Sequence, residues 1–163
     1  MGREGYGGGV ARVEQVRSWV VLLATVVLTG CRSAGHLPPA DLSTGGWRVR
    51  QGQAVWKNGG AELAGEVILA IRPGASSLQF IKTPLPLVSA QTEGTRWTVH
   101  FAADNRTISG RGVPPAELVW VHVAAALSGQ VPREPIRFVS DATGNWEVRN
   151  SQTGETVSGF LSQ

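Results

Sequence analysis

The sequence predicts a mainly β domain, built as an antiparallel meander that closes toward a sandwich or an incomplete barrel. Three observations predict this fold class. Short apolar runs recur about every 10 residues after residue 46, several of them alternate with polar residues, and Gly, Pro, Asn or Asp separates many of them. One longer apolar run near residue 120 carries helix signals instead.

The first 30 residues have the organisation of a secretory signal peptide. Arg12 and Arg17 precede an apolar run, Trp19 to Leu28, which is shorter than the roughly 20 residues a membrane-spanning helix needs. The run closes in a lipobox, Leu28-Thr29-Gly30-Cys31, whose thiol receives diacylglycerol before cleavage on its amino side. Cys31 is the single cysteine of the chain, so no disulfide competes for its thiol. The alternative is an ordinary signal peptide that a cysteine follows by chance.

These features predict a lipid-anchored protein. Residues 1–30 are the signal peptide, and Cys31 carries covalent diacylglycerol and an N-acyl chain. Residues 31–46, rich in Gly, Pro, Ser and Thr, are predicted to form a flexible tether, and residues 47–163 a single domain. Arg32, in a position where Asp would retain a lipoprotein in the inner membrane, indicates the inner leaflet of the outer membrane, with the domain facing the periplasm.

The clearest strand is Arg96 to Phe101, in which Trp97, Val99 and Phe101 alternate with polar residues. Turn residues such as Asn58-Gly59-Gly60 and Arg72-Pro73-Gly74 lie between the runs. The other predicted strands are Trp47–Trp56, Leu63–Ile71, Ser77–Lys82, Leu87–Thr92, Asn105–Ser109, Pro135–Ser140, Asn145–Arg149 and Thr156–Leu161.

A helix is predicted after Pro114-Pro115, because Glu117 lies in its first turn and Gly129 follows its end. The β-branched stretch Leu118 to Val123 would also suit a strand, but the alanines that follow extend the run beyond usual strand length. A helix that is apolar on nearly every side must be covered, and the mouth of an open barrel would cover it. The predicted plug and cavity-lining residues are Leu118, Trp120, Val121 and Leu127.

The segment Lys82 to Leu87 contains two prolines that are expected to end the preceding strand and to exclude regular pairing. Leu85 would then project from a stiff turn, where it could contact a membrane or an acyl chain together with Leu87. Leu85 folding back under the barrel is the open alternative.

No catalytic constellation is visible in the sequence. His36, His100 and His122 do not share metal-ligand spacing, and no nucleophile motif accompanies His122. The net charge of +3 comes without a basic run, which gives no support to nucleic-acid binding. The tryptophans after residue 46 mostly occupy strand positions that core packing explains. We therefore expect a protein that is not an enzyme and that holds no metal and no cofactor beyond the lipid on Cys31.

Several segments resemble the outer-membrane lipoprotein receptor LolB, of the LolA/LolB lipoprotein-localisation family. The stretch Ser77-Leu78-Gln79-Phe80-Ile81-Lys82-Thr83-Pro84-Leu85 is similar to that family's strand and Pro-Leu turn. Residues 112–118, followed by Leu127-Ser128-Gly129-Gln130-Val131-Pro132, are similar to its helix with a flanking Gly and Pro. The lipobox and Asn145-Trp146 fall in the matching order, and the resemblance covers roughly residues 47–149.

The resemblance implies an incomplete antiparallel β-barrel with a helical plug. Its apolar cavity would receive acyl chains of other lipoproteins from a LolA-like periplasmic carrier, and Leu85 would help to place that cargo in the membrane. The chain departs from the family at Pro86, where a glycine is usual. It is also shorter, since it ends at Gln163 without the last strands.

Two functions compete at this point. The first is a LolB-like acceptor that binds acyl chains in an apolar cavity. The second is a structural or envelope-assembly accessory lipoprotein whose core is filled by its own side chains and holds no ligand. A hydrolase that uses His122 is a more distant third.

Overall fold

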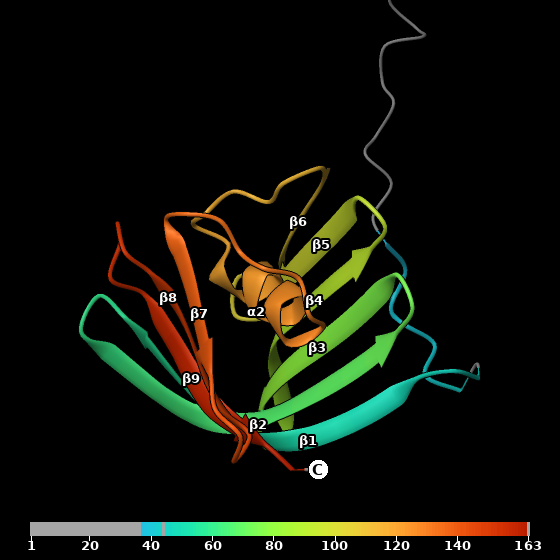
Figure 1. The fold of residues 1–163 in the computed structure, drawn as a ribbon, viewed down its shortest axis with the longest axis horizontal. Helices are drawn as coiled ribbons and strands as arrows, with labels where there is room; N and C mark the ends of the chain where they lie inside the picture. Colours follow the sequence, from blue (N-terminus) through green and yellow to red (C-terminus); the bar gives the residue numbers. More distant parts are fainter. Residues whose placement is uncertain (1–36, 44, 163) are drawn as a thin grey trace, which may run out of the picture. The chain divides into compact units, whose positions relative to one another are not determined.

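Residues 37–43 and 45–162 are described by the computed structural model, and their fold is mainly β. Nine antiparallel strands form one sheet in the order β6-β5-β4-β3-β2-β1-β9-β8-β7, so β6 and β7 are its two edges and the sheet is not closed (Figure 1). The strands are β1 (Arg48–Asn58), β2 (Ala61–Arg72), β3 (Ala75–Lys82), β4 (Leu85–Glu93), β5 (Arg96–Phe101), β6 (Arg106–Arg111), β7 (Ile136–Ser140), β8 (Asn145–Asn150) and β9 (Thr156–Leu161). Each corresponds to a predicted strand. The signal peptide, Cys31 and His36 lie outside the described residues.

The β3–β4 hairpin differs from the prediction. The two prolines were expected to exclude regular pairing, but the strands pair as far as Lys82 and Leu85. The register shifts between Phe80 and Ile81, and Pro86 pairs with Ile81 beyond the shift. An irregularity of this kind leaves backbone groups unpaired, so a residue without an N–H is tolerated there.

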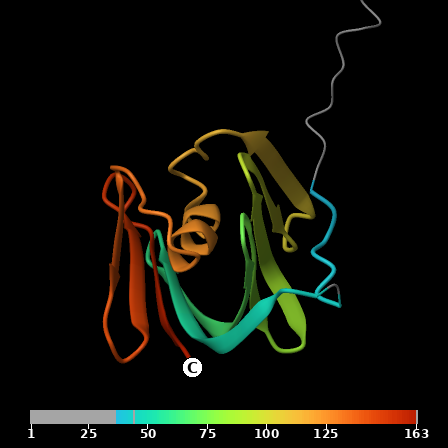
Figure 2. The same ribbon diagram turned by 45° about the vertical axis from the view of Figure 1, so that its right-hand side comes forward.

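The helix α2 (Val119–Leu127) confirms the predicted helix and excludes the strand alternative. Seven of its nine residues are buried, and no side chain caps its first turn. It lies in the hollow of the curved sheet and packs against strands of both halves, most closely against β4 (Figures 1 and 2). A helix with no polar face is stable there because the sheet covers it.

The space between α2 and the sheet is filled by side chains. Trp120 is 1% exposed, and its ring stacks on Phe80 with centroids 4.8 Å apart. Trp56 meets the same indole edge-on at 5.8 Å. The fully buried residues around them are Val67, Leu69, Leu78, Val88, Val99, Val119, Val121, Val123, Val148 and Val157.

Three aromatic rings on the inner face lie against glycines. Trp97 pairs with Gly110 on β6, and Trp146 pairs with Gly159 on β9. A Cβ on either glycine, or on Gly65 next to Phe80, would run into the neighbouring ring. These strand-interior glycines therefore provide the space that the large core side chains need.

The segment before β1 lies on the outer face of the sheet, and we call residues 37–43 the N-terminal strap. Leu37 is buried, and its N–H donates to Thr98 Oγ1 at 3.2 Å. The Gln91 amide, oriented to satisfy both groups, donates to the Pro38 carbonyl and accepts from the Ala40 N–H. The predicted tether, residues 31–46, is thus docked over part of its length, because strand side chains satisfy its backbone groups.

Gly159→Ala tests the packing at the centre of the sheet. The new Cβ would meet the Gln53 carbonyl and the Trp146 ring, so we expect a loss of about 1–3 kcal/mol in the free energy of unfolding. Urea denaturation measures this loss. Gly45→Ala is the control, since a Cβ there meets nothing within 4 Å. Equal stability of the two variants would show that the sheet can relax around the added methyl group.

Candidate functional site

A cleft of about 290 Å³ lies beside α2, where the chain passes from one edge of the sheet to the other. Its walls come from the ends of β4 and β5, from residues 112–116 after β6, from α2, from residues 130–135 before β7 and from Ile136 at the start of β7. This volume is near the lower end for ligand-binding pockets. The cleft is therefore large enough for part of a lipid chain.

Apolar groups form much of the wall of the cleft. Trp97, Ala125 and Ile136 lie along it, and prolines contribute from both flanking segments. Val113 is 70% exposed and Val131 is 90% exposed, and both line the cleft. Exposed valines from both connections give the cleft an apolar rim.

His122 lines the cleft from α2 and is held in place by a hydrogen bond. Its Nε2 lies 3.1 Å from the Pro115 carbonyl oxygen, so Nε2 carries the proton and donates it. Burial lowers the pKa of His122 below its ordinary value, against an opposing effect of the Pro115 and Pro114 carbonyls. A neutral imidazole that donates to backbone is a structural group, and no nucleophilic partner is found for it among the described residues.

The same proline segment is fixed from a second side. Asn150, at the end of β8, is fully buried, and its side-chain amide donates to the Ala116 carbonyl at 2.9 Å. Its Oδ1 accepts the N–H groups of Gln152 and Thr153 in the following turn. Asn150 was not singled out in the sequence, because only the fold brings β8 beside residue 116.

The four predicted plug and lining residues turn toward the core. Trp120 and Val121 are essentially without exposure, Leu118 is buried, and Leu127 is partly buried against the same cluster. None of the four lines the cleft. His122 and Ala125 are the α2 residues that do so.

The β3–β4 hairpin places its two leucines differently. Leu85 is 64% exposed at the start of β4, which decides against the alternative in which it folds back. Leu87 is partly buried and packs against the core. The cleft is lined by Thr92 and Gly94 at the other end of β4, so Leu85 and the cleft occupy opposite ends of that strand.

A buried carboxyl group follows the turn between β8 and β9. Glu155 accepts a hydrogen bond from Trp56 Nε1 at 2.7 Å. Burial raises the pKa of Glu155, and the indole hydrogen bond opposes that effect. Of the other predicted core tryptophans, Trp97, Trp120 and Trp146 are buried, whereas Trp47 is partly exposed outside the core.

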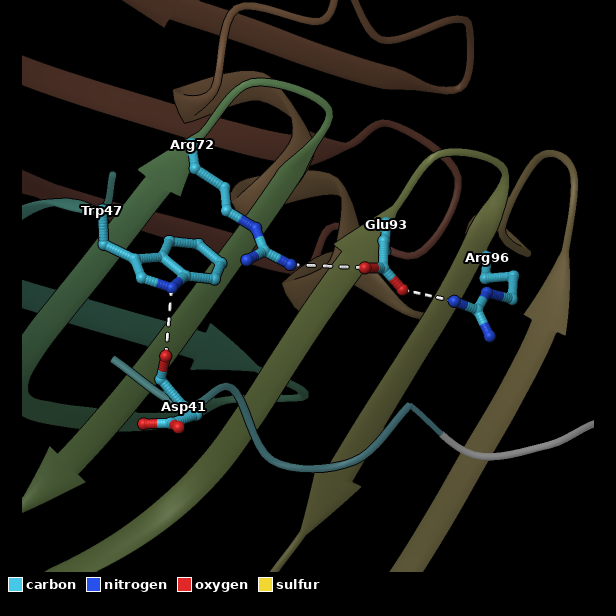
Figure 3. A network of polar contacts seen from close by, with 5 residues as sticks. All are labelled: Asp41, Trp47, Arg72, Glu93 and Arg96. Carbon is cyan, nitrogen blue, oxygen red and sulfur yellow. Dashed lines mark hydrogen bonds and ion pairs between the residues drawn. The ribbon is translucent and has the colours of Figure 1, made fainter. Parts of the chain in front are cut away.

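Trp47 joins a polar network on the outer face of the sheet (Figure 3). Its indole N–H donates to the Asp41 carbonyl, and the Arg72 guanidinium lies 4.6 Å from its ring centroid. Arg72 and Arg96 share the Glu93 carboxylate. The network connects the strap to β2, β4 and β5.

The part of the chain that the structure describes was also searched for a metal site and for a membrane-spanning helix. No group of three or more His, Cys, Asp or Glu side chains gathers there, and none of its helices is long and apolar enough to cross a membrane. No protein-family model matches the chain, and a comparison with curated proteins finds no match either. The resemblance to LolB stays a prediction from the residues.

His122→Gln tests the structural role of the imidazole. Since burial lowers the His122 pKa, the unfolded chain binds more protons, and stability should fall as the pH drops below about 6.5. Gln can keep the donation to Pro115 but does not titrate. The difference in unfolding free energy between wild type and His122→Gln should therefore shift in favour of Gln as the pH falls, measured by urea denaturation across that range.

Glu155 titrates in the opposite sense, because a raised carboxyl pKa makes stability fall as the pH rises. It is present in both proteins, so its contribution cancels in the difference. A pH-independent difference for His122→Gln would contradict the assignment.

Proposed function

We propose that this protein is a lipid-anchored outer-membrane protein that binds acyl chains, as a LolB-like acceptor in lipoprotein localisation. The observation that carries the proposal is the cleft beside α2, with its apolar wall and exposed valine rim. Each buried CH₂ of a ligand contributes about 0.8 kcal/mol, so even part of an acyl chain would bind measurably. Handover of such a chain requires only a higher affinity than that of its donor, and no covalent step.

The proposal includes the description of the fold as an incomplete barrel with a helical plug. An unclosed sheet that curves around α2 is consistent with an incomplete barrel in which the helix acts as a plug. The cleft would then be the place where the plug and the two sheet edges leave space. Movement of residues 130–134, most of which are exposed, would enlarge the cleft while Ile136 stays in the core cluster.

The lipid anchor sets how far the domain can lie from the membrane. Cys31 precedes the buried Leu37 by six residues, a segment that spans at most about 21 Å when fully extended. Docking of the strap therefore holds the sheet much closer to the bilayer than a free tether ending at residue 46 would. This proximity suits a protein that passes acyl chains to the membrane.

A second candidate is a structural or assembly-accessory lipoprotein. The filled interior favours it, because Trp120, Phe80 and the surrounding valines are packed between α2 and the sheet. In that case the cleft would be only a surface hollow. Ligand binding separates the two candidates.

Ala125→Trp tests the cleft as the ligand site. Ala125 lines the cleft from α2, and an indole there would occupy it. We expect wild-type protein to bind a fluorescent fatty acid and Ala125→Trp to lose at least tenfold in affinity, measured by fluorescence titration. Ala142→Trp, on the exposed β7–β8 turn, is the matched control and should bind as wild type. Absence of binding by the wild type would favour the accessory function.

Leu85→Glu tests the exposed hairpin tip. Leu85 is 64% exposed, so a carboxylate should leave stability within about 0.5 kcal/mol of wild type but remove the apolar contact. In cells depleted of the protein, we expect this variant not to restore the outer-membrane localisation of other lipoproteins, followed by membrane fractionation. Val139→Glu is the control, because Val139 on β7 is 67% exposed. Full rescue by Leu85→Glu would exclude a role for the tip.

A further inference from the structure

A row of arginines crosses the outer face of the sheet at the end that holds the cleft. The strand register places Arg72, Ala75, Glu93, Arg96 and Arg111 opposite one another in turn on β2, β3, β4, β5 and β6. We call Arg72, Arg96 and Arg111 the arginine row. Cross-strand partners share a face of the sheet, so all three guanidinium groups project from the outer face.

The arginine row is only partly neutralised. Glu93 is the one carboxylate among these cross-strand partners, and both Arg72 and Arg96 form ion pairs with it. Arg111 is exposed and has no ion-pair partner among the described residues, although Arg96 lies directly opposite. Like charges in opposite positions destabilise a sheet, so the fold retains an arrangement that costs folding free energy.

The N-terminal strap contacts the sheet near the same place. It is bonded to Gln91 and Thr98, which are cross-strand partners two residues from Glu93 and Arg96. Two residues of a strand correspond to about 7 Å, so the chain reaches the sheet one outer-face row away from the arginines. Leu85, by contrast, lies six residues from Gln91 along β4, or about 20 Å.

We propose that the arginine row binds the anionic phospholipid headgroups of the membrane in which Cys31 is anchored. The inference rests on the lipid anchor of the proposed function, and it adds which side of the domain faces the membrane. Guanidinium groups suit phosphate oxygens, and a basic side chain near an anionic bilayer strengthens binding. The Leu85 tip then points away from the headgroups, where it meets acyl chains that a carrier delivers.

The test uses the predicted mature chain, residues 31–163, with Cys31→Ser, so that neither the apolar signal peptide nor the lipid anchor dominates binding. Co-sedimentation compares phosphatidylcholine vesicles with vesicles that also contain phosphatidylglycerol. We expect binding to the anionic vesicles only, and weaker binding as salt is added. Arg111→Glu, which changes the charge by two units, should weaken this binding about 30-fold. Lys82→Glu makes the same change at the opposite end of β3, on a residue that is also exposed, and should bind nearly as wild type.

Equal binding to both kinds of vesicle, absence of binding, or equal losses in the two variants would overturn the inference. The salt dependence of the wild type needs no variant, so it remains decisive if Arg111→Glu fails to fold. Acyl-chain binding is measured separately with the fluorescent fatty acid and Ala125→Trp. Loss of the acyl site would leave vesicle binding intact, so failure of the proposed function and failure of this inference can be told apart.

Discussion

The burial of α2 is the constraint on which the rest of the structure depends. Seven of its nine residues are buried, and it offers no polar face to water. A flat sheet could cover only one side of such a helix, whereas the curved sheet contacts it through strands of both halves. The curve in turn brings β1 and β9 so close that Gly52 and Gly159 have no space for a Cβ on their shared inner face.

The same arrangement produces the cleft. The chain must cross from β6 to β7 by way of α2, so the two edges of the sheet are joined by irregular segments rather than by backbone pairing. His122 and Asn150 fix the first of these segments through the carbonyls of Pro115 and Ala116. The second segment, residues 130–135, forms the facing wall. The cleft therefore has one wall held by buried hydrogen bonds and one made largely of exposed residues.

The two ends of the sheet carry different chemistry. The cleft end holds the arginine row with a single glutamate, and the strap reaches the sheet one row away. The opposite end of β4 holds the exposed Leu85. For the proposed lipid-anchored protein, the short segment between Cys31 and Leu37 would favour the cleft end as the end near the membrane.

Local pattern was enough to predict the strands and the helix, because alternation and turn residues depend on neighbours in sequence. Leu85 could be identified as a candidate but not placed, since its exposure depends on how β3 pairs with β4. Other features depend on residues that are distant in sequence. These are the docked strap, the burial of Trp120 and Val121 in the core, the hydrogen bonds of Asn150 and His122, and the arginine row. The sequence by itself determined the class of fold and the lipobox pattern. Only the tertiary structure decided what fills the interior and which side chains face the cleft, because those contacts arise when the sheet curves around α2.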